Sequence, residues 1–126
     1  MGAADWQAFV YEASDVTVNG ASLEVALGDG RRQRVTVREA SSTFELSSVV
    51  VRADRLSEIE DAALRAWRRN RTTHLVGFKI DQRGRLVATA WVAKAGVSGD
   101  EFVSHVRRLA READLFESQL TGVDRE

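Results

Sequence analysis

The chain has 126 residues, with 18 basic and 19 acidic side chains and a formal net charge of −1. This length fits one domain, residues 1–126, that can bury a single core without covalent staples. The chain contains no cysteine, which excludes disulfides, thiolate metal sites and cysteine nucleophiles. The charge balance lacks the basic excess that is typical of proteins that bind nucleic acids.

No segment of the sequence has the pattern of a membrane span or a secretory signal. The longest apolar run, residues 86–93, is interrupted by Thr89 and is far shorter than the ~20 residues that a membrane helix needs. Residues 1–6 have neither the basic nor the apolar region of a signal peptide. We therefore expect a cytoplasmic protein that does not engage a membrane.

The first part of the chain predicts a short helix and three strands. Residues 6–13 have apolar side chains at helical spacing, and residues 16–27 then alternate as one strand. The turn at residues 28–30, Gly-Asp-Gly, leads into a second strand over 34–38, because glycine accepts positive φ angles without steric cost. A third strand is predicted over 43–52.

Near Asp54 the pattern changes to the period of a helix. Five apolar residues lie at offsets of 0, 3, 7, 10 and 11 and form one stripe: Leu56, Ile59, Ala63, Ala66 and Trp67. A single helix is therefore predicted, with Trp67 on its buried side. The helix ends in an arginine-rich run up to Arg71, and arginines suit the negative end of the helix dipole.

Two further strands and a final helix complete the chain. Residues 76–80 and 86–92 alternate as strands on either side of a turn, and Ser98 and Glu101 have the spacing of a capping box. The apolar stripe of the final helix begins at Phe102 and continues toward Leu120. The order α-β-β-β-α-β-β-α with short hairpins predicts an α+β fold, an antiparallel five-stranded sheet with helices packed on one face.

No constellation of residues in the sequence indicates catalysis. His74 and His105 belong to different elements and have no metal-ligand spacing, so neither a metal nor a cofactor is predicted. The sequence also lacks a Gly-x-Ser-x-Gly turn and a glycine-rich phosphate loop. We therefore expect that the protein is not an enzyme.

Two clusters of arginines leave one alternative open, a regulatory domain that contacts nucleic acid. These candidates are Arg31, Arg32, Arg34, Arg68, Arg69 and Arg71. If the two clusters adjoined beside an exposed tryptophan, they could follow a phosphate backbone. The acidic overall balance and the predicted burial of Trp67 argue against this alternative.

The outer face of the predicted sheet is unusually apolar. If Ile80 faces Leu86 across the turn, Phe78 and Ala88 share the face that the helices cover. The opposite face then holds the candidate partner-binding or dimer residues Val49, Val51, Leu75, Val87 and Trp91. Contiguous exposed apolar patches usually mark interaction sites. A covering segment, or a register shifted by one residue, would remove the patch.

The order of these elements and three short motifs resemble the superfamily of YbjN-type and type III secretion chaperone-like proteins. The motifs are the helix end at residues 67–71, the hairpin at 78–86 and the start of the last helix at 98–102, with a late Ala-Asp step at Ala113. The resemblance covers roughly residues 16–120. It implies a small cytoplasmic domain, commonly a homodimer, that binds another polypeptide and does not turn over a substrate.

The two branches of this superfamily imply different roles. Secretion chaperones hold an unfolded effector segment across apolar patches, with some addition of strands at sheet edges, whereas YbjN-type members are linked to regulation. The near-neutral charge of this chain and its brief first helix differ from the pattern of the secretion chaperones. These departures favour the YbjN-like branch.

Overall fold

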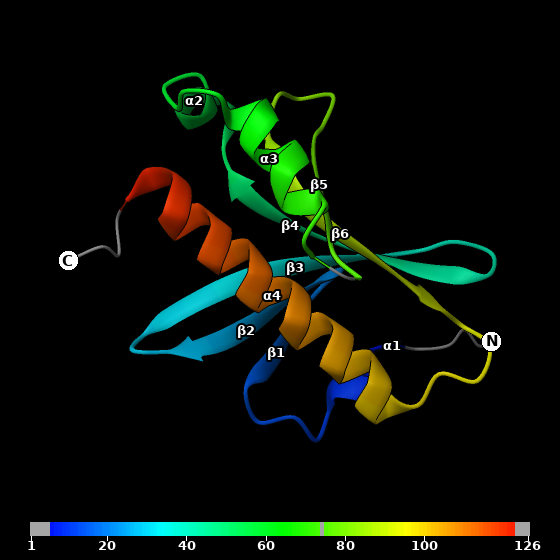
Figure 1. Cartoon of the computed structure of the whole chain (residues 1–126). Helices are drawn as coiled ribbons and strands as arrows, with labels where there is room; N and C mark the ends of the chain where they lie inside the picture. Colours follow the sequence, from blue (N-terminus) through cyan, green and yellow to red (C-terminus); the bar gives the residue numbers. More distant parts are fainter. Residues whose placement is uncertain (1–5, 74, 123–126) are drawn as a thin grey trace.

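The computed structural model describes residues 6–73 and 75–122, in which one helix crosses a six-stranded sheet (Figure 1). The helices are α1 (Trp6–Val10), α2 (Ala53–Leu56), α3 (Ala62–Asn70) and α4 (Gly99–Thr121). The strands are β1 (Val16–Asn19), β2 (Ser22–Gly28), β3 (Arg31–Glu39), β4 (Thr43–Val51), β5 (Gly77–Ile80) and β6 (Leu86–Ala93). The predicted α+β fold is confirmed, although the number of strands and the order of elements differ.

All neighbouring strands of the sheet are antiparallel, in the order β1-β2-β3-β4-β6-β5. Four pairs are sequence-local hairpins, whereas β4 pairs with β6 across the segment that holds α2, α3 and β5. Helix α4 lies diagonally across one face of the sheet (Figure 1) and packs on β2, β3, β4 and β6. The other face of the sheet, called the outer face below, carries no helix among the described residues.

The prediction of one strand over residues 16–27 is wrong. The segment forms two strands joined at Asn19-Gly20-Ala21, and Gly20 has a φ of 65°. Asn-Gly between alternating apolar residues is a strong hairpin signal, because both residues tolerate positive φ angles. The sheet therefore has six strands where five were predicted.

The single helix predicted after Asp54 is also wrong. The chain forms the short helix α2, leaves helical geometry, and begins α3 after Asp61, which has a left-handed φ of 58°. The interruption rotates α3 relative to the stripe that starts at Leu56. Ala66 stays buried, whereas Trp67 is 57% exposed and not on the buried side.

The core lies between the inner face of the sheet and α4. Ser98 and Glu101 form the predicted capping box, with reciprocal hydrogen bonds of 3.1 Å. Just inside this cap, the Phe102 ring packs edge-on against Phe44 of β4 at 5.4 Å, and Phe9 of α1 lies at 5.3 Å. Burying a phenylalanine side chain stabilises a fold by about 1.5–3 kcal/mol. This cluster therefore holds α1 and the start of α4 against the sheet.

The two edges of the sheet are treated differently. Asn70, at the end of α3, accepts a 2.7 Å hydrogen bond from the Phe78 N–H and donates a 2.9 Å bond to the Phe78 carbonyl. The amide of Asn70 thus takes the place of a neighbouring strand beside β5. At the opposite edge, the Ala26 N–H donates to the Asp15 carbonyl, so Asp15 bonds toward β2. Residues of an antiparallel strand bond alternately to one side and the other. The N–H and carbonyl of Val18, three residues later, therefore point away from β2. No described strand pairs with this side of β1.

Candidate functional site

The outer face of the sheet carries the predicted partner-binding residues on its central strands. The register predicted for the β5–β6 hairpin is confirmed, because Ile80 pairs with Leu86 and Phe78 with Ala88. On β6, Val87, Thr89 and Trp91 therefore point away from α4. Their partners on β4 are Val49, Ser47 and Glu45. Trp91 projects from this surface with 65% of its area exposed.

The five apolar candidates do not form one exposed patch. A β-bulge between Val49 and Val51 shifts the register of β4, so that Val51 pairs with Leu86 and joins the core. The placement of Val51 on the outer face is therefore wrong. Val87 is only 5% exposed and Val49 is half-buried, whereas Leu75 is 62% exposed at a left-handed φ of 70°.

Charged and small polar side chains occupy the rest of the outer face. Arg32 and Arg34 both lie within 3.7 Å of the Glu24 carboxylate, and Arg38 lies 3.6 Å from Glu45. Thr36, Ser47 and Thr89 follow one another across β3, β4 and β6. The outer face is thus a polar surface with Trp91 as its large apolar anchor, and we call it the Trp91 surface.

The structure does not join the two arginine clusters. Arg31 extends toward α4 and forms a 2.6 Å ion pair with Asp114, whereas Arg32 and Arg34 lie on the outer face. Arg69 packs between α3 and α4, where it pairs with Glu112 at 3.2 Å. Since the two clusters lie apart and carboxylates pair with the arginines at 31, 32, 34 and 69, the described residues present no continuous basic track for a nucleic acid.

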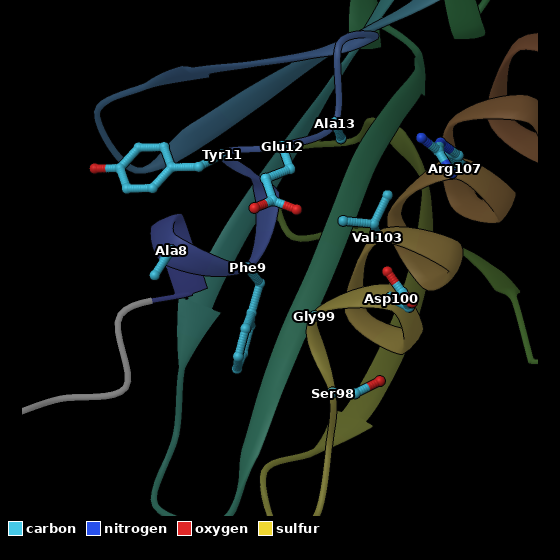
Figure 2. Close-up of a pocket in the computed structure, with 10 residues that line it drawn as sticks. All are labelled: Ala8, Phe9, Tyr11, Glu12, Ala13, Ser98, Gly99, Asp100, Val103 and Arg107. Atoms are coloured by element: carbon cyan, nitrogen blue, oxygen red, sulfur yellow. The ribbon is translucent and has the colours of Figure 1, made fainter.

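A groove of about 680 Å³ separates α1 and the following loop from the start of α4 (Figure 2). Phe9 and Val103 contribute apolar surface, and Tyr11 is 77% exposed beside it. At one end Arg107 donates two 2.8 Å hydrogen bonds to the carboxylate of Asp15. These bonds hold the pKa of Asp15 below its usual value and raise the pKa of Arg107. The Asp15–Arg107 pair fastens the start of β1 to α4.

The exposed side of α3 is a surface that the sequence analysis missed. Leu64 and Trp67 are 43% and 57% exposed, three residues apart on one helix face. The guanidinium of Arg71 lies 5.2 Å above the Trp67 ring, and Arg68 is exposed on the same helix. The i, i+3 spacing of Leu64 and Trp67 is visible in the sequence. The prediction of one continuous helix, however, placed Trp67 on the buried side of that helix.

The described residues contain no group of three or more histidine and acidic side chains that could hold a metal ion. His105 is half-buried on α4, and His74 lies outside the described residues. No described helix is long and apolar enough to cross a membrane.

Several solved structures have a fold similar to that of this chain. No family model matches the chain, and no curated protein matches it in sequence. YbjN from E. coli superimposes with a TM-score of 0.60 at 16% identity, covering 88% of this chain and 84% of the other. A chain of the ExsC–ExsE complex gives 0.57 at 16% identity, with coverage of 82% and 80%.

A third similar structure comes from the type III secretion system of Pseudomonas aeruginosa. A chain of its heterodimeric ExoU–SpcU complex gives a TM-score of 0.55 at 16% identity, with coverage of 81% and 84%. The resemblance to YbjN-type and type III secretion chaperone-like proteins is thus confirmed at the level of the fold. At these identities the likeness concerns the fold alone.

Proposed function

We propose that the protein is a non-catalytic domain that binds a protein or peptide and thereby holds or regulates a polypeptide partner. The observation that carries this proposal is the exposed Trp91 on a sheet face that no described helix covers. Tryptophan is enriched among the residues that dominate binding energy at protein interfaces. The fold supports the proposal, because two of the similar structures are complexes with a second polypeptide.

The open edge of β1 supports an extended segment as the ligand. A strand that pairs with the outward N–H and carbonyl of Val18 would gain main-chain hydrogen bonds that do not depend on its sequence. Side chains of the same segment could then reach the outer face. The β1 edge and Trp91 are separated by β2, β3 and β4, so they would contact different parts of the bound polypeptide.

We also propose a cytoplasmic location and a homodimer. The candidate residues for both partner binding and self-association remain Trp91 and Leu75, supported by their exposure. Val49 and Val87 also point to the outer face, but Val49 is half-buried and Val87 is buried. They would therefore support a bound chain from below and offer it little contact area.

Affinity purification of the tagged protein from its native lysate at moderate salt, read by mass spectrometry, tests the proposal. We expect one stoichiometric polypeptide with the wild type and its loss with Trp91→Asp. Leu115→Asp is the matched control, because Leu115 is 47% exposed on α4. Circular dichroism and the oligomeric state of the purified variants show that each is folded and whether Trp91 also governs self-association.

A partner retained equally by wild type and Trp91→Asp would refute the assignment of the Trp91 surface. Absence of any stoichiometric polypeptide would refute a dedicated chaperone. Nucleic acid in the eluate would instead support the arginine clusters as a binding site.

A further inference from the structure

We infer that the surface formed by α3 and the facing part of α4 recognises acidic side chains of the partner polypeptide. This inference rests on the proposed protein-binding function and assigns a second, chemically distinct contact to it. The α3–α4 site comprises a shallow cavity of about 300 Å³ and the exposed helix face beside it. The cavity is lined by Arg65, Arg68, Arg69, Thr72, Phe116 and Gln119.

Three guanidinium groups converge on this cavity, and carboxylates only partly neutralise them. Arg69 has a single acidic partner, Glu112, and its buried Nε is the only buried side-chain nitrogen or oxygen among the described residues without a hydrogen-bond partner. Arg65 donates to the backbone carbonyl of Gln119 at 3.1 Å. Among the described residues, the exposed guanidinium of Arg68 has neither a hydrogen bond nor an ion pair. The site therefore keeps positive charge that carboxylates do not offset.

Aromatic packing holds part of this charge in place. The guanidinium of Arg69 lies 4.8 Å from the centre of the Phe116 ring and 5.6 Å from that of Phe78. A 2.6 Å bond to the side-chain oxygen of Gln119 fixes its orientation. A guanidinium that is already ordered loses little entropy on binding a carboxylate, which its planar fork matches in geometry.

The helix face beside the cavity adds apolar contact area. Leu64 and Trp67 are exposed next to Arg68, and Arg71 stacks on the Trp67 ring. Tryptophan and arginine are the residue types most enriched at binding hot spots. Charge complementarity therefore selects a partner segment in which acidic side chains alternate with apolar ones.

The probe is a fluorescein-labelled peptide of 12 residues in which two leucines and two glutamates alternate along the chain. Its anisotropy is measured with the full chain at low salt, against a matched peptide in which glutamine replaces glutamate. We expect the glutamate peptide to bind at least ~10-fold more tightly, since one charge-assisted hydrogen bond is worth roughly that factor. Arg68→Glu and Trp67→Ala should each weaken its binding by a similar factor.

Arg83→Glu provides a control of equal charge change, because Arg83 is exposed in the β5–β6 turn and does not line the cavity. Equal loss in Arg68→Glu and Arg83→Glu would show that only net charge matters and would overturn the inference. Selective competition by inorganic phosphate, beyond chloride at equal ionic strength, would reassign the site to phosphate. Self-association of the wild type that Arg68→Glu abolishes, without peptide selectivity, would reassign the site to a second copy of the chain.

The purified system separates this inference from the proposed function. A native partner lost from Trp91→Asp but kept at full strength by Arg68→Glu, with no peptide selectivity, would refute the α3–α4 site alone. Peptide selectivity without any native polypeptide partner would support the site and refute a dedicated chaperone.

Discussion

At the scale of single residues, Asn70 shows how one side chain closes a sheet edge. Its amide makes the two hydrogen bonds to Phe78 that a neighbouring strand would make. In the sequence, Asn70 lies within the arginine-rich run that ends a predicted helix, and that pattern does not point to β5. The local pattern could not reveal the bonds to Phe78, because they join α3 to a strand whose position depends on the whole sheet.

We expect Asn70→Ala to lower the free energy of unfolding by about 1–2 kcal/mol, since two side-chain hydrogen bonds are lost at a partly solvated edge. Hydrogen exchange provides the sharper measurement. The amide of Phe78 should exchange faster in the variant, whereas that of Val92 in the interior strand β6 should not change. Unchanged exchange at Phe78 would show that water replaces the Asn70 amide without cost.

The ion pair between Asp15 and Arg107 makes stability depend on pH. The bonds from Arg107 lower the pKa of Asp15 in the folded state below its reference value of 3.8. The pair therefore stabilises the fold fully above that value, and the contribution is lost as pH falls through the folded-state pKa.

Asp15→Asn should lower the free energy of unfolding by about 1 kcal/mol at pH 7, a modest value because both side chains are about one-third exposed. In denaturant titrations at several pH values, the difference from wild type should shrink below pH ~4. A difference that stays constant down to pH 2 would show that packing, and not the charge of Asp15, is responsible.

At the scale of elements, the helices and hairpins with the clearest local sequence signals were the ones predicted correctly. Helix α4 combines a capping box with a long apolar stripe, and its predicted start is confirmed. The β2–β3 and β5–β6 hairpins were also predicted, because Gly30 and Gly84 supply the positive φ angles that their turns need. The β1–β2 turn carried the same kind of signal at Asn19-Gly20 and was overlooked.

The interruption between α2 and α3 was harder to predict. Apolar residues between Leu56 and Trp67 fit one helical stripe, so the local pattern gave no reason to end the helix within it. The left-handed conformation of Asp61 and the packing of Ala62 and Ala66 in the core break the stripe. Tertiary packing overrode local periodicity here, and it moved Trp67 to the surface.

The capping box of α4 offers a direct test at this scale. Ser98→Ala removes the side-chain acceptor for the Glu101 N–H and should lower the free energy of unfolding by about 1 kcal/mol. Ser104→Ala, at an exposed position inside the same helix, should leave stability unchanged or slightly raised. Thermal unfolding of both variants gives the comparison, and equal effects would show that the cap contributes nothing specific.

At the scale of the whole molecule, the sequence predicted which strand residues point to the outer face for all but Val51. It did not predict the charged side chains that share this face with Trp91. The strict alternation of strand side chains placed Val49, Val87 and Trp91 on the outer face. The bulge that moves Val51 into the core leaves no sequence signal, because all three residues from 49 to 51 are valine. The Arg38–Glu45 pair beside Trp91 depends on β4 lying between β3 and β6, a strand order that the local patterns did not specify.

The unequal edges of the sheet limit how copies of this protein can assemble. A filament that grows by strand pairing needs two complementary edges on each molecule, one to receive and one to extend. Here Asn70 occupies the main-chain groups of Phe78 on β5, whereas no described strand lies beside the outer side of β1. Two copies that met there would be related by a two-fold axis and would leave no free strand behind. Pairing of β1 with β1 would therefore end at a dimer and would not by itself extend into a fibre.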